Sequence, residues 1–222
     1  MSAYLYEITG WAGTPKGGRA WVETALLPFL PQGKGLRVDL YLPADSLYGD
    51  PTPAFIVMVG FPDQATAEAV MGSADIVRIL ETASIPLQLK GDFMDVRRCA
   101  INGAAAEDLV GDFSFVVRYY LPASDVQEFQ DYYQRVHPAI LAEFDGIRNI
   151  LCNIPESLAS APRVPSSNYL IGNQVMFDDV AAFERANETE VGARAMADVA
   201  TFPKFSDHSV HYAMIRTRLL DR

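Results

Sequence analysis

Short apolar runs alternate along the chain with longer segments whose apolar residues recur at helical spacing. The runs are rich in Val, Ile, Phe and Tyr, which is typical of β-strands. The segments between them show the periodicity of helices packed on one side. The predicted strands cover residues 4–8, 36–42, 54–61, 93–101, 115–121, 147–154, 169–177 and 209–219, and the predicted helices cover residues 18–30, 65–80, 124–144 and 180–199.

The order strand-helix-strand-strand-helix-strand occurs twice. Leu27-Pro28 in the first half corresponds to His137-Pro138 in the second, and Gly-Leu-Arg at 35–37 corresponds to Gly-Ile-Arg at 146–148. In both halves the following strand ends in a segment that contains a proline, an acidic residue, Ser and Leu. Since matched landmarks in a matched order indicate an internal repeat, we interpret the chain as a tandem duplication.

Each half has the split βαβ order of a ferredoxin-like unit. The chain is therefore predicted to be an α+β protein with domains at 1–103 and 112–222, joined by a linker at 102–112. A four-stranded sheet with both helices on one face leaves its other face uncovered. We expect the two halves to pack sheet to sheet as an intrachain barrel, giving a monomer with an internal pseudo-dimer or a homodimer.

The predicted helix 124–144 has the clearest boundaries. Ser124 can cap its free N–H groups, with Gln127 three residues later completing a capping box, and Gly146 follows its last turn. One apolar stripe is expected to face the sheet, formed by Val126, Phe129, Tyr133, Val136, Ile140 and Phe144.

The charge balance excludes several classes of partner. The formal net charge is −10, whereas nucleic-acid binding and membrane-surface binding both need concentrated Lys and Arg. No apolar run is long enough for a transmembrane helix, and residues 1–10 lack the basic start of a secretory signal. We therefore expect a cytoplasmic protein, in which Cys99 and Cys152 are reduced thiols of the core.

The segment 132–147, Tyr-Tyr-Gln-Arg-Val-His-Pro-Ala-Ile-Leu-Ala-Glu-Phe-Asp-Gly-Ile, resembles the EthD-like branch of the dimeric α+β barrel superfamily. The resemblance covers residues 113–218 and reaches the first half only through the repeat. It implies a barrel of two ferredoxin-like units with a pocket between sheet and helices. Relatives include monooxygenases, isomerases, cyclases, dehydratases and proteins that handle haem. The first half departs from the pattern because Leu27 stands where His137 stands.

Three residues are candidates for catalysis. His137 exchanges protons near neutral pH, and Tyr133 lies four residues earlier on the same side of the helix. His211 shares a strand face with Ala213 and Ile215. Each histidine could instead be structural, His137 as a boundary residue bonded to the backbone, and His208 is expected in a solvated loop.

Five residues are candidates for substrate binding: Tyr119, Arg118, Asn173, Tyr212 and Tyr169. Tyr119 alternates with Arg118 on the first strand of the second half, so they face opposite ways. An arginine inside an apolar strand must be paired or face a ligand, so Arg118 either binds a substrate oxygen or forms an ion pair across the two-sheet interface; Arg216 is similarly ambiguous. Asn173 or Gln174 could point polar atoms into the pocket.

No dinucleotide loop, phosphate loop or nucleophile elbow is present in the sequence, so we predict no cofactor. A zinc or iron site formed by the three histidines and Asp207 is conceivable, but no tight ligand spacing supports it, so we predict no metal. The pattern favours a cofactor-independent enzyme of isomerase, cyclase, dehydratase or monooxygenase type, acting by proton transfer on a hydrophobic, aromatic or polyketide-like small molecule. The alternatives are a non-catalytic binding or pathway accessory protein and, less favoured, a haem protein.

Overall fold

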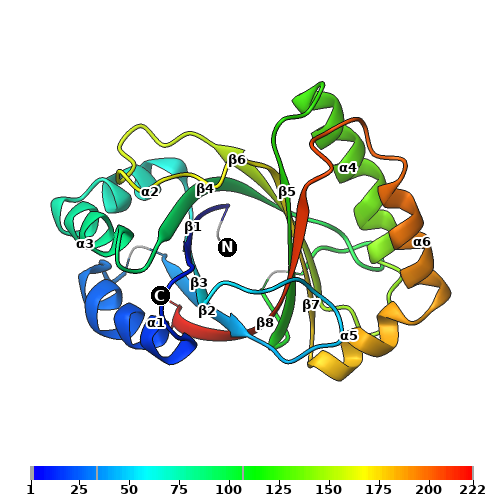
Figure 1. Cartoon of the computed structure of the whole chain (residues 1–222), viewed down its shortest axis with the longest axis horizontal. Helices are drawn as coiled ribbons and strands as arrows, with labels where there is room; N and C mark the ends of the chain where they lie inside the picture. Colours follow the sequence, from blue (N-terminus) through cyan, green and yellow to red (C-terminus); the bar gives the residue numbers. More distant parts are fainter. Residues whose placement is uncertain (1–2, 34, 107, 222) are drawn as a thin grey trace.

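The computed structural model describes residues 3–33, 35–106 and 108–221. Its eight strands, all paired antiparallel, form one closed barrel in the order β1-β3-β2-β8-β5-β7-β6-β4, with the helices on its outside in two groups (Figure 1). The ends of the two predicted domains, residues 1 and 222, and residue 107 of the predicted linker lie outside the described residues.

The elements follow the predicted order, except that each of the predicted helices 65–80 and 180–199 is two helices, α2 with α3 and α5 with α6. The first half consists of β1 (Tyr4–Gly10), α1 (Pro15–Trp21) continued by a π-helical turn (Val22–Leu26) and a 3₁₀ turn (Leu27–Phe29), β2 (Arg37–Pro43), β3 (Phe55–Phe61), α2 (Gln64–Met71), α3 (Ala74–Ser84) and β4 (Leu89–Arg98). The second consists of β5 (Phe113–Tyr120), α4 (Val126–Leu141), β6 (Asn149–Glu156), β7 (Tyr169–Phe177), α5 (Val180–Asn187), α6 (Glu190–Val199) and β8 (Ser209–Asp221).

The two halves join edge to edge. Strands run β4-β1-β3-β2 in the first half and β8-β5-β7-β6 in the second, and the seams between the halves are β2·β8 and β4·β6. The expectation of two sheets packed face to face is therefore corrected: strand pairing at both seams makes one barrel wall. Closure removes the unpaired sheet edges that would otherwise invite association.

Side chains alternate between the barrel interior and the helix layer, as the period of a strand requires. On β5, Val116 points to the interior cluster, whereas Val117 and Tyr119 pack beneath the helices. On β8, Tyr212 and Met214 belong to the interior cluster, and Ala213 to a cluster with the helices. The predicted alternation of β5 and β8 is confirmed.

A buried ion pair lies inside the barrel. Arg118 of β5 has no exposed surface, and its guanidinium contacts the carboxylate of Glu7 on β1, which is 1% exposed. Arg118 also donates to the carbonyls of Val117 and Asn173, at 2.8 and 3.2 Å, and its Cζ lies 5.5 Å from the Tyr169 ring centroid. Of the two predicted roles of Arg118, the structure shows the ion pair.

Gly172 makes room for this arginine. A Cβ at that position would lie 2.8 Å from Arg118 Nη1 and 3.1 Å from its Cζ. A residue larger than glycine at position 172 would displace the Arg118 guanidinium from its partners.

Two details of α4 differ from the sequence prediction. Asp125, not Ser124, is the N-cap, because its carboxylate accepts the Glu128 N–H at 3.0 Å; the Ser124 N–H donates to the Lys204 carbonyl instead. The buried stripe is Phe129, Tyr133, His137, Pro138 and Leu141, while Val126 is 42% exposed. The stripe is therefore rotated so that His137 lies on it rather than beside it. No described helix is long and apolar enough to cross a membrane.

Removing one partner of the Glu7–Arg118 pair leaves an uncompensated charge in the barrel. Glu7→Gln is expected to lower the free energy of unfolding by about 3–5 kcal/mol, measured by urea denaturation. The double variant Glu7→Leu/Arg118→Met should lower the free energy of unfolding much less than Glu7→Gln does, because it leaves no unpaired charge. The control is Glu143→Gln, which breaks an exposed pair with Arg194 and should change stability little. Equal effects of the buried and exposed variants would contradict the interpretation.

Candidate active site

A pocket of about 480 Å³ lies between the second-half helices and the outer face of the barrel. Its walls come from β5, β7, β8, α4, α5 and α6, and most of its lining is apolar. The lining residues are Phe115, Val117, Tyr119, His137, Leu141, Phe144, Asn173, Val175, Phe183, Asn187, Ala195, Met196, Val199 and His211.

His137 is held at the helical wall of this pocket. It is 7% exposed, and its ring packs against Tyr133, with centroids 5.0 Å apart, and edge-on to Phe202 at 5.4 Å. Its Nδ1 lies 2.9 Å from Oδ2 of Asp198 on α6. Within the described part of the chain, Nε2 makes no hydrogen bond, so this nitrogen is the one available to a bound molecule.

Asp198 was missed by the sequence reasoning. It is 9% exposed, and its other oxygen, Oδ1, accepts a hydrogen bond from Thr201 Oγ1 at 3.1 Å. Thr201 is in turn bonded to the Tyr132 hydroxyl at 2.7 Å. Helical spacing could have indicated Asp198. It stands three residues after Ala195 and four before Phe202, so it shares the apolar, inward side of the segment with them. A buried acid is expected to have a partner.

Burial decides the protonation of His137. Desolvation lowers the pKa of its imidazole, Asp198 opposes this by hydrogen bond and charge, and His211 lowers the pKa further. The ring is therefore neutral near pH 7. With the Asp198 carboxylate accepting from Nδ1–H, the lone pair is on Nε2.

His211 brings a second imidazole to the same pocket from β8. Its backbone N–H donates to Asp50 Oδ2 at 2.8 Å, and its Nδ1 lies 3.5 Å from the same oxygen. Its ring packs near Phe115, with centroids 5.7 Å apart. Burial lowers the pKa of His211, with Asp50 acting in the opposite direction.

Two other predicted residues, Tyr119 and Asn173, also line the pocket. The Asn173 amide donates to the Leu151 carbonyl at 3.2 Å. Tyr133 does not line the pocket but packs between His137 and Tyr119, whose ring centroid is 5.3 Å from its own. Burial raises the pKa of both tyrosines, so both phenols stay protonated near neutral pH.

The remaining predicted residues lie elsewhere. Arg118, Tyr169 and Tyr212 are in the barrel interior, across the sheet from His137. His208 stacks on Tyr120 at the surface, with ring centroids 4.3 Å apart. Arg216 pairs with Asp39, Nη1 to Oδ1, at 2.7 Å. The structure thus gathers only part of the predicted set around one cavity.

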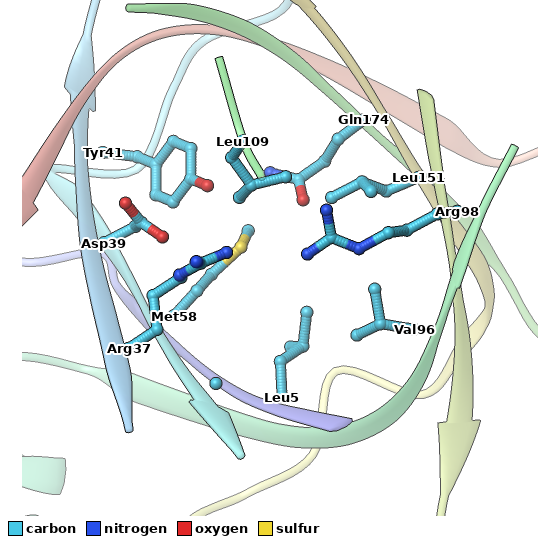
Figure 2. A pocket seen from close by; sticks show the side chains of 11 residues that line it. Leu5, Arg37, Asp39, Tyr41, Met58, Val96, Arg98, Leu109, Leu151 and Gln174 are labelled. Atoms are coloured by element: carbon cyan, nitrogen blue, oxygen red, sulfur yellow. The ribbon is translucent and has the colours of Figure 1, made fainter. Parts of the chain in front are cut away.

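A second cavity, of about 370 Å³, lies in the barrel interior and contains none of the three candidate catalytic residues. Figure 2 shows the side chains of Arg37 and Arg98 extending into it from opposite walls, with Leu109 of the linker above them. The linker is fixed there because Arg37 Nη2 lies 2.8 Å from Asp108 Oδ1 and Arg98 Nη1 donates to the Ala106 carbonyl at 3.0 Å.

In the first half, Phe55 fills the space beneath α1. A Cβ at Gly18 would lie 2.1 Å from its ring and one at Gly10 would lie 2.2 Å from it. Leu27, at the position that corresponds to His137, packs against this core. Among the described residues, no three His, Cys, Asp or Glu side chains are grouped to hold a metal ion.

Solved structures with this fold include an anthrone oxidase-like protein, with a TM-score of 0.63 at 11% identity over 98% of this chain and 95% of that one. A candidate monooxygenase from Lactobacillus acidophilus has a TM-score of 0.57 at 10% identity over 97% of this chain and 95% of that one. A candidate monooxygenase from Fusobacterium nucleatum has a TM-score of 0.56 at 10% identity over 100% of this chain and 98% of that one. At these identities the likeness shows the fold alone, which agrees with the predicted α+β barrel. The superfamily and the EthD-like assignment stay predictions. No family model and no curated protein matches the sequence.

The titration of His137 tests the electrostatics of the pocket. Its folded-state pKa lies below the ordinary value of 6.5, so the unfolded chain binds more protons and stability falls as pH drops through about 6.5, levelling off below the folded-state pKa. Histidine NMR should show a midpoint below 6.5. Asp198→Asn removes the charge that raises the pKa and should lower the midpoint further. A higher midpoint in Asp198→Asn would contradict this account.

Proposed function

We propose that this protein is a cofactor-independent enzyme that removes a proton from a hydrophobic, aromatic or polyketide-like small molecule. The observation that carries the proposal is the His137–Asp198 pair, which stands buried at the wall of an otherwise mostly apolar pocket. A pocket of this composition suits a ring system with few polar groups.

His137 is the general base in this proposal. Its Nε2 lone pair takes the substrate proton, and the Asp198 carboxylate stabilises the imidazolium that results and holds the ring orientation. A base with a depressed pKa stays unprotonated at neutral pH and is ready to act. Tyr119 reaches the same cavity, and its protonated hydroxyl is the donor best suited to a developing oxyanion.

The proposed reaction is oxidation of the substrate by dioxygen. Deprotonating the CH₂ of an anthrone-like ring yields a carbanion that dioxygen can oxidise directly: CH₂ and O₂ give C=O and H₂O, with no resident cofactor needed for the balance. The structural likeness to an anthrone oxidase-like protein and to candidate monooxygenases supports this choice over simple isomerisation.

We further propose that the chain is a duplicated pair of ferredoxin-like domains, 1–103 and 112–222, in which only the second carries the site. The equal strand order of the halves supports duplication. Leu27 in place of His137 and the Phe55 ring beneath α1 support loss of a site in the first half. The complete barrel in one chain supports action as a monomer with an internal pseudo-dimer.

The first experiment is a turnover screen of anthrones and hydroxylated polycyclic aromatics, monitored by oxygen consumption and product mass. His137→Gln is expected to lower kcat by 10²-fold to 10⁴-fold, the usual contribution of a general base. Asp198→Asn should lower kcat by about 10²-fold, as expected when a histidine loses its orienting carboxylate. His208→Gln, a histidine outside the pocket, is the matched control and should be unaffected.

Other outcomes identify the alternatives. A folded His137→Gln variant with unchanged turnover would remove the proposal. Tight binding of an aromatic ligand that Ala195→Phe abolishes, without turnover, would identify a binding protein, because Ala195 lines the pocket. A Soret band in the purified protein would identify a haem protein.

A further inference from the structure

The two cysteines meet at one of the seams that close the barrel. Cys99 follows the last residue of β4, and its N–H donates to the Ile150 carbonyl of β6 at 2.9 Å. Cys152 lies within β6, and the two Sγ atoms are 3.7 Å apart. Both thiols are free. The sulfurs are therefore in contact across β4·β6, between the two halves of the chain.

The two thiols differ in access. Cys152 is fully buried, in a cluster with Tyr119 and Tyr133, whereas Cys99 is partly exposed at the edge of that cluster. Both line an open cleft of about 730 Å³. A reagent entering the cleft would meet Cys99 first, with Cys152 directly behind it.

Arginines surround this cleft. Arg97 and Arg135 line it, whereas the side chain of Arg98, which also borders the cleft, extends into the barrel interior (Figure 2). The chain as a whole carries a net charge of −10. Arg97 is oriented by Asp95 and Gln134, at 3.1 and 2.9 Å, and Arg135 lies over the Tyr132 ring. The cleft is therefore a local positive region, which favours anionic reagents and the thiolate form of cysteine.

We propose that Cys99 and Cys152 form a reactive dithiol that exchanges with anionic low-molecular-weight disulfides such as oxidised glutathione. The Cys99 thiolate attacks one sulfur of the reagent, forms a mixed disulfide and expels one thiolate. Cys152 then loses its proton, and its sulfur attacks Cys99 and expels the second. The protein dithiol loses two electrons and two protons, and the reagent disulfide becomes two thiols.

The electrostatics agree with this division of roles. The pKa of Cys99 is lowered because the Cys152 thiol donates to its sulfur, and the pKa of Cys152 is raised because it serves as that donor and is buried. The accessible sulfur is thus the better thiolate and the buried one the resolving thiol. This inference does not depend on the function proposed for the His137 pocket.

The test treats the reduced, native full chain with oxidised glutathione, followed by alkylation and peptide mass spectrometry. Wild type should lose both free thiols together and yield a Cys99–Cys152 crosslinked peptide. Cys152→Ser should accumulate one glutathionyl group on Cys99, and Cys99→Ser should leave Cys152 unmodified. A glutathionyl adduct that persists in wild type, or thiols that react only in urea, would overturn the proposal.

A second measurement does not depend on the variants folding. Phenylarsine oxide binds neighbouring thiols in pairs, so native wild type should take up one equivalent, and none after oxidation. Uptake only after denaturation would overturn the proposal.

The charge of the cleft is tested separately. Arg135→Gln should slow reaction with the anionic dithionitrobenzoate reagent several-fold and leave the rate with uncharged hydroxyethyl disulfide nearly unchanged. Arg194→Gln, outside the cleft, is the matched control. Equal slowing with both reagents would remove the preference for anions.

Discussion

Closure of the barrel is the constraint on which the rest depends. The seams β2·β8 and β4·β6 hydrogen-bond strands from different halves of the chain, so neither half has a free sheet edge. Closure also creates a narrow interior that side chains can largely fill. Aromatic, methionine and aliphatic side chains fill most of it and leave one cavity of about 370 Å³. Arginines that enter the interior have partners there: Arg118 pairs with Glu7, Arg216 with Asp39 and Arg37 with Asp108. A charge inside a closed wall cannot reach bulk water, so each needs its partner.

The same wall positions the candidate active site on its outer face. Since strand residues alternate, β5 sends Arg118 inward and Tyr119 outward, where the helix layer meets it. The base comes from α4 and its carboxylate from α6, so the pair exists only when both helices lie against the sheet. Placing a polar pair between packed elements, with aromatic rings on its sides, excludes water and holds one tautomer.

Much of this could be predicted from the sequence. The strand order, the bounds of β7, the start of α5 and the alternation of β5 and β8 all follow from local periodicity, which a single chain displays directly. The arginine within β5 was recognised as needing a partner, but Glu7 lies over a hundred residues away, and no local pattern identifies it. The edge-to-edge seams and Asp198 were missed for the same reason: they are contacts between elements distant in sequence. The cap of α4 was missed because adjacent Ser124 and Asp125 can both act as caps, and the sequence does not show which side chain accepts the Glu128 N–H.

The Phe55 ring packs tightly against Gly10 and Gly18 in the first half, whereas the second half keeps a pocket beneath its helices. A cavity costs stability because its lining loses packing contacts, so a half that keeps a hollow for a ligand carries a deficit. The first half is densely packed at the corresponding place. Because its strands pair with those of the second half along both seams, its packing also stabilises the second half. With the first half densely packed and covalently joined to the second, substitutions in the pocket lining of the second half can be tolerated without unfolding the barrel.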